Sequence, residues 1–176
     1  MDIYETKLPG LIIIEPKVFD DERGFFYESY NKKVFDEMIG ENINFLQDNH
    51  SSSKKGVLRG IHAQKEPYAQ GKLVRVIQGT VIDYAIDLRQ ESSTYLEYFS
   101  IELSSNNKKQ LWIPEGFGHA FFTISDNAQL AYKATNFYNK ESEVTIMWDD
   151  PKIGIEWPEE VDTSLISFKD KSGIYV

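Results

Sequence analysis

The strongest strand signal in the chain lies in residues 72–89, KLVRVIQGTVIDYAIDLR. Its second half alternates between two faces, with Ile82, Tyr84, Ile86 and Leu88 on one and Asp83, Ala85, Asp87 and Arg89 on the other. A two-residue period with one apolar face is the pattern of a β-strand. Gln78-Gly79 is a turn signal in the middle, so the stretch predicts strand structure on both sides of a turn.

Other parts of the chain repeat this short-strand pattern. Strands are predicted at 111–113, 121–124, 130–137 and 144–148, and turn-rich segments at 104–107 and 125–127 separate them. One helix is predicted from Asn31 to Ile39, because Asn31 can cap it, an apolar stripe follows, and Gly40 can end it. Many short strands with one or two short peripheral helices indicate an all-β fold, a β-sandwich or jelly-roll β-barrel.

Composition limits the function. A chain of 176 residues fits a single domain, residues 1–176, and the absence of cysteine excludes disulfides and thiolate metal sites. A net charge of −9 argues against nucleic acid as a partner, although local arginines and lysines could still hold one small phosphorylated ligand. The N-terminus is not a signal peptide, and no apolar run is long enough for a membrane span. We therefore expect a soluble, cytoplasmic protein.

The three histidines are the first candidates for chemistry. Strict alternation along residues 59–64, RGIHAQ, puts His62 and Gln64 on one face of a strand, toward the barrel interior, and Arg59 on the other. His119 follows a Pro/Gly turn at the start of the next strand. For a single histidine, the plainest interpretation is a hydrogen-bonded core side chain, because buried polar groups generally find partners.

A metal site is an alternative for the same residues. The segment Pro114-Glu115-Gly116-Phe117-Gly118-His119 resembles the second half of the metal-binding cupin signature, and imidazole with carboxylate suits Fe(II) or Mn(II). The first half of that signature needs a second histidine where this chain has Gln64. Glu66 could still serve as a ligand, so a metal-binding cupin stays open as an alternative.

Seven segments, in order along the chain, carry a more specific resemblance. They are FDDERGFFYES (19–29), QDNHS (47–51), LRGIHAQ (58–64), QGKLVR (70–75), WIPEGF (112–117), YKAT (132–135) and SFKD (167–170). Together they resemble the dTDP-4-dehydrorhamnose 3,5-epimerase family, whose members are cupin-like in fold, over essentially the whole chain. The resemblance implies a metal-free jelly-roll homodimer, without a cofactor, that inverts C3 and C5 of dTDP-4-dehydro-6-deoxy-D-glucose on the route to dTDP-L-rhamnose.

This chemistry accounts for the residue types. Inverting a carbon beside a ketone needs a base on one face, an acid on the other and a group that stabilises the enolate oxygen. The resemblance implies that His62 is the base and that Asp170 orients and stabilises its imidazole. It implies that Tyr132 is the acid on the opposite face and that Lys72 is the cation near the developing oxyanion.

The resemblance also implies a nucleotide-binding set. The matching positions are Arg23, Arg59 and His119 for the pyrophosphate, Glu28, Gln47 and Asn49 for the nucleotide, Tyr138 for stacking on thymine, and Glu143 and Lys169 for further contacts. Some of these contacts are expected to come from the partner subunit of the homodimer. Taken one at a time, each polar segment could equally be an ordinary surface turn.

Two positions depart from the family pattern. Ala63 stands where an aromatic residue is usual, and Gly118-His119-Ala120 replaces the commoner Ala-His-Gly. Residue 63 should point away from His62, so its small side chain is expected to leave a hole on the other face of the strand. These departures leave open an epimerase that acts at a single centre, or on another nucleotide-linked 4-keto sugar.

Overall fold

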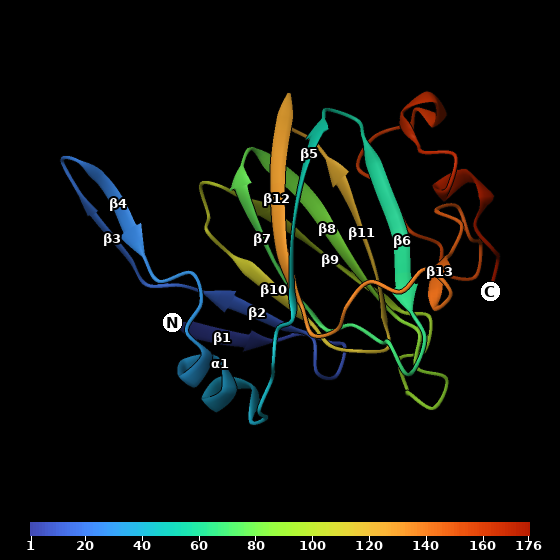
Figure 1. Cartoon of the computed structure of the whole chain (residues 1–176). Helices are drawn as coiled ribbons and strands as arrows, with labels where there is room; N and C mark the ends of the chain where they lie inside the picture. The colour runs from blue at the N-terminus through green and yellow to red at the C-terminus, as the bar shows by residue number, and fades with distance from the viewer.

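The computed structural model describes all of residues 1–176 and consists mainly of two facing antiparallel sheets (Figure 1). The six-stranded sheet has the order β1 (Asp2–Glu5), β2 (Ile12–Glu15), β10 (Gln110–Ile113), β7 (Lys72–Gln78), β12 (Asn127–Ala134) and β5 (Gln47–Lys54). The five-stranded sheet has the order β13 (Glu143–Thr145), β6 (Leu58–Gln64), β11 (Phe117–Thr123), β8 (Thr80–Asp87) and β9 (Tyr98–Ser104). The all-β jelly-roll prediction is confirmed, as a sandwich of two separate sheets and not a closed barrel.

The predicted turn at Gln78-Gly79 carries the chain from one sheet to the other, because β7 and β8 lie in different sheets. Gly79 has φ +76°, and a Cβ there would meet the carbonyl oxygen of Asn127 at 2.1 Å. Only glycine fits this crossing. The main core lies between the sheets and includes Val74 of β7 and Ala85 of β8, which are both fully buried.

The outer faces of both sheets are covered. Helix α1 (Lys32–Ile39) packs Phe35 against Trp112 on the outside of the six-stranded sheet, with Asn31 and Gly40 as its caps, as the sequence predicts. The C-terminal residues 146–176 cover the outside of the five-stranded sheet, where the Trp157 ring lies 4.7 Å from that of Tyr84. This segment contains the short 3₁₀ turns η1 (Thr163–Leu165) and η2 (Asp170–Ser172).

A two-stranded hairpin, β3 (Val18–Asp21) and β4 (Gly24–Tyr27), projects away from both sheets (Figure 1). Its aromatic side chains are open to solvent, with Phe26 71% exposed. The sequence analysis did not predict these strands. The structure has no helix that combines the length and the apolar character needed to span a membrane.

The boundaries of some predicted strands differ from the structure. The strand predicted at 130–137 starts earlier and ends at Ala134, because residues 135–142 form a loop between β12 and β13. The side chains of β8 alternate between two faces as predicted, but neither face is exposed to solvent. The Asp83 side is fully buried between the sheets, and the Tyr84 side is buried under the C-terminal segment. A strand that is covered on both faces has no solvent-exposed polar face.

Candidate active site

A cavity of about 230 Å³ opens between the two sheets, with β7 and β12 on one side and β6 and β11 on the other. From the predicted catalytic set it is lined by His62, Lys72 and Tyr132. From the predicted binding set it is lined by Arg59, His119, Tyr138, Glu143 and Lys169. Segments more than 100 residues apart in sequence, such as residues 59–62 and 169, therefore meet in one place.

His62 and Asp170 form a hydrogen-bonded pair. His62 Nε2 lies 2.6 Å from Asp170 Oδ1, and the Asp170 carboxylate also accepts a bond from the Gly60 amide at 3.4 Å. Burial would raise the pKa of Asp170, but the hydrogen bond and charge of His62, with further hydrogen bonds from Gly60 and Ser167, together outweigh it, so the pKa lies below its usual value. An ionised carboxylate at Nε2 leaves Nδ1 as the nitrogen that can accept a proton, and it stabilises the imidazolium that results.

A β-bulge at Gly60 brings Arg59 onto the same side of β6 as His62. In the pairing of β6 with β11, His62 is opposite His119 and Arg59 is opposite Phe121. The two pairs are three residues apart along β6 but only two residues apart along β11, so β6 contains one extra residue between them. The prediction that Arg59 faces away from His62 is therefore wrong, because the extra residue resets the alternation. Gly60 has φ +117°, and a Cβ there would lie 2.6 Å from both Ala120 Cβ and the His119 carbonyl oxygen.

Lys72 and Tyr132 lie on neighbouring strands of the opposite sheet. Lys72 is only 7% exposed, and its ammonium lies 5.8 Å from the centre of the Tyr132 ring. Burial lowers the pKa of Lys72 to about 8, although the carboxylates of Asp83 and Glu143 pull it upward. Burial, together with the charge of Glu143, raises the pKa of Tyr132. Tyr132 is therefore protonated at neutral pH and able to donate a proton.

His119 is held by a carboxylate that the sequence analysis did not select. Its Nε2 lies 2.9 and 3.1 Å from the two carboxylate oxygens of Asp83, which is completely buried. The alternation put Asp83 on the polar side of β8 with Asp87, so the sequence did not show that it is buried; an aspartate buried in a core nearly always has a partner. The cavity thus contains two imidazoles on neighbouring strands, each paired with its own carboxylate.

Three residues join at the mouth of the cavity. The Tyr138 hydroxyl donates to Glu143 Oε2 at 3.2 Å, and the Lys169 ammonium is paired with Glu143 Oε1. This contact connects the loop after β12, strand β13 and the C-terminal segment. It places an aromatic ring, a cation and an anion beside the entrance.

Four of the predicted binding residues do not line this cavity. Arg23 lies at the tip of the β3–β4 hairpin and Glu28 follows the hairpin directly, both exposed. Gln47 and Asn49 lie on β5, where Gln47 accepts a bond from the Tyr138 amide at 2.9 Å and donates to Asn49 Oδ1 at 3.0 Å. In this chain the Gln47 side chain is therefore engaged with the protein itself.

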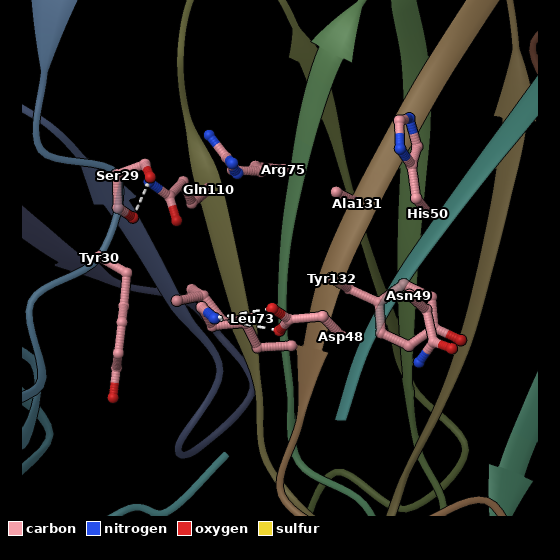
Figure 2. A pocket seen from close by; sticks show the side chains of 11 residues that line it. Ser29, Tyr30, Asp48, Asn49, His50, Leu73, Arg75, Gln110, Ala131 and Tyr132 are labelled. Carbon is pink, nitrogen blue, oxygen red and sulfur yellow. Dashed lines mark hydrogen bonds and ion pairs between the residues drawn. The ribbon is translucent and has the colours of Figure 1, made fainter. Parts of the chain in front are cut away.

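A second hollow, of about 200 Å³, lies on the outer side of the six-stranded sheet (Figure 2). Figure 2 shows Arg75 and Gln110 close to Ser29 on one side, and His50 on β5 on the other. His50 Nε2 is 3.0 Å from Gln129 Oε1 on the neighbouring strand β12. Neither imidazole–carboxylate pair lines this hollow.

Two further observations concern possible metal ligands and Ala63. No group of three or more histidine, aspartate or glutamate side chains is arranged to hold a metal ion. Ala63 borders an apolar hollow of about 380 Å³ behind β6, together with Val144 and Ile146, as expected from its small side chain. Gln64 lines the active-site cavity beside His62, as the strand alternation predicted, and four further lining residues were not predicted: Ser51, Ala63, Gln70 and Phe121.

Comparison with known proteins gives a consistent result. Residues 5–176 match the family described as dTDP-4-dehydrorhamnose 3,5-epimerase. A dTDP-4-dehydrorhamnose 3,5-epimerase from Shigella flexneri is 54% identical over 173 residues, which cover 98% of this chain and 94% of that protein.

Two solved structures are informative. The dTDP-6-deoxy-D-glucose-3,5-epimerase from Legionella pneumophila, in complex with dTDP-4-keto-L-rhamnose, is 46% identical with a TM-score of 0.93, covering 99% of this chain and 92% of that one. A 3'-monoepimerase from Streptomyces bikiniensis, in complex with dTDP-quinovose, is 27% identical with a TM-score of 0.91, covering 97% and 85%.

Proposed function

Because the chain belongs to the dTDP-4-dehydrorhamnose 3,5-epimerase family, we propose that it inverts C3 and C5 of dTDP-4-dehydro-6-deoxy-D-glucose. It is an isomerase, and the product is the nucleotide-linked 4-keto sugar of dTDP-L-rhamnose synthesis. The observation that carries the proposal is a single cavity lined by a carboxylate-paired imidazole, His62, a protonated phenol, Tyr132, and a buried ammonium, Lys72.

The proposed reaction uses these groups in turn. His62 removes the proton from a carbon beside the C4 ketone, and Asp170 stabilises the imidazolium. The Lys72 ammonium stabilises the negative charge that develops on the ketone oxygen. Tyr132 then delivers a proton to the same carbon from the opposite face. His62 loses its proton to water and Tyr132 regains one from water, and the same cycle at the second carbon completes the reaction.

The proposed nucleotide site surrounds this centre. The Arg59 guanidinium suits the pyrophosphate oxygens, and His119, held by Asp83, lies on the neighbouring strand. Tyr138 at the mouth offers an aromatic face to the thymine base, with Lys169 beside it. Replacing Arg59 with alanine should mainly weaken binding of dTDP, measured by calorimetry, whereas unchanged affinity would contradict this role.

We also propose a homodimer in which the β3–β4 hairpin of each chain completes the partner's site. Arg23 and Glu28 are family-matched binding residues that lie outside the cavity of their own chain. The hairpin projects from the sheets with exposed aromatic side chains (Figure 1). We propose separately that the protein acts in the cytoplasm, as the sequence analysis predicts.

A mixing experiment tests the shared site. Arg23→Ala and His62→Ala chains should each be inactive as pure dimers. After equal mixing and exchange, hybrid dimers carry one intact site, so about a quarter of wild-type activity should return. No recovery, with hybrids demonstrated by mass spectrometry, would argue that Arg23 acts within its own chain or not at all.

Deuterium uptake tests the reaction itself. With dTDP-4-dehydro-6-deoxy-D-glucose in heavy water, label at both C3 and C5 of the product supports the proposal. Similarity to the Streptomyces bikiniensis 3'-monoepimerase favours one alternative, an epimerase that acts at a single centre. Label at one carbon alone would establish that alternative, and no label at either would exclude both.

A further inference from the structure

The loop between β12 and β13 is held by glutamine side chains. Its residues 136–139 have no strand partner, so their backbone groups need other hydrogen bonds. Gln70 donates to the Asn136 carbonyl at 2.7 Å, and Gln47 accepts from the Tyr138 amide at 2.9 Å. Gln64 supplies two more, to the Phe137 carbonyl and from the Asn139 amide, and the Asn136 side chain accepts from the Phe137 amide.

Gln64 uses almost its full hydrogen-bonding capacity on these loops. Its Nε2 donates to the Phe137 carbonyl at 3.1 Å and to the Tyr68 carbonyl at 2.6 Å, and its Oε1 accepts from the Asn139 amide at 2.7 Å. An amide has two N–H donors and one carbonyl, so every one of these groups is engaged.

These bonds flank Tyr138 in sequence, because they hold the backbone of the residue before it and of the residue after it. Tyr138 is 54% exposed as a residue, and its only side-chain hydrogen bond is the one to Glu143. Little packing therefore holds the ring, and its place at the cavity mouth depends on the backbone. Gln64 is also directly opposite Glu143 in the pairing of β6 with β13. The backbone of Gln64 therefore lies beside Glu143, while its side chain holds the loop that carries Tyr138.

We propose that Gln64 is a positioning residue for nucleotide binding, which fixes the backbone on both sides of Tyr138 so that the ring forms a wall for an aromatic base. This inference rests on the proposed function, since it requires a nucleotide in the cavity. Gln64 acts through the loop and not on the sugar, so it should influence binding much more than the proton transfers.

The first test replaces Gln64 with methionine, which keeps the length of the side chain and removes all three bonds. Stacking on an aromatic ring contributes to the affinity for a base, so partial loss of the Tyr138 wall should raise the Kd for dTDP and the KM about tenfold. The kcat at saturation should stay within about twofold of wild type. Gln78→Met, on the exposed end of β7 with one bond to Gln129, is the matched control and should change neither.

A second variant keeps the test decisive if methionine impairs folding. Gln64→Glu keeps an oxygen to accept from the Asn139 amide but cannot donate to the two carbonyls, so its Kd should also rise. Folding of each variant is checked by circular dichroism and thermal melting. A folded variant that binds dTDP as tightly as wild type would overturn the inference.

A double-mutant cycle with Tyr138→Ala separates positioning from general loosening. If Gln64 acts through the ring, Gln64→Met should add little to the loss of affinity already caused by Tyr138→Ala. Additive losses would show that Gln64 acts elsewhere and would refute the inference. A wild-type protein that neither binds dTDP nor epimerises the sugar would instead refute the proposed function.

Discussion

Replacing Lys72 with methionine should stabilise the fold while it abolishes turnover. The Lys72 ammonium is buried in the wall of the cavity, and burial lowers its pKa from 10.5 to about 8. The folded protein therefore holds a charge that would be better solvated in the unfolded chain. Methionine has a similar length and no charge, so it removes this cost together with the ammonium that we propose stabilises the enolate oxygen.

The size of the gain follows from the pKa difference. A shift of about 2.5 units at 1.36 kcal/mol per unit corresponds to about 3 kcal/mol. Below pH 8 the lysine is charged in both states, so the folded state carries the full cost and the methionine variant shows the full gain. Between pH 8 and 10.5 only the unfolded chain stays protonated, so wild-type stability rises with pH and the gain shrinks toward zero.

Urea unfolding at pH 7 and pH 10, followed by far-UV circular dichroism at one protein concentration, measures this difference. Lys54→Met is the control, because Lys54 is exposed on β5 and should change stability by less than about 0.5 kcal/mol. A Lys72→Met variant that is no more stable than wild type at pH 7 would refute the reasoning. So would a gain of the same size at both pH values.

Four further outcomes are expected. The kcat/KM of the wild type should fall above about pH 8 as Lys72 loses its proton, and Lys72→Arg, if active, should lack this limb in a pH–rate profile. Asp170→Asn should fold normally and lose about 10²–10⁴-fold in kcat, because the imidazolium loses its carboxylate; a loss below tenfold would contradict its role. Tyr132→Phe should exchange deuterium at one carbon without inverting it, and inversion at a normal rate would remove Tyr132 as the acid. Ala63→Phe should fill part of the 380 Å³ hollow behind β6 and raise stability by about 1 kcal/mol in urea unfolding without lowering kcat; a destabilised variant would show that the hollow cannot accept a ring.

Local signals in the sequence were enough for the elements that local interactions determine. The caps of α1 at Asn31 and Gly40 are read directly from residue type, and the alternation in 72–89 identifies β7 and β8. The resemblance also named side chains that the fold brings into one cavity, including His62 and Tyr132. Composition and periodicity alone would not have connected residues so far apart in sequence.

The features that were missed depend on contacts between distant strands. The bulge places Gly60 so close to Ala120 and the His119 carbonyl on β11 that no side chain fits, and nothing within residues 58–64 reveals those neighbours. The role of Asp83 likewise depends on β8 being covered on both faces, by the opposite sheet and by the C-terminal segment. A two-residue period shows that a strand has two faces but not what covers them.

The two imidazole–carboxylate pairs differ in one property that supports the assignment of the base. His62 and His119 are cross-strand neighbours, and each has its Nε2 bound by a carboxylate, but His62 is 30% exposed and His119 is 7% exposed. A base that takes a proton from two carbons in succession must release each proton to water before the next step. The exposed imidazole can do so, whereas the buried one, held by both oxygens of Asp83, is suited to a fixed contact with the ligand. Exposure therefore separates the roles of two histidines whose hydrogen bonds are alike.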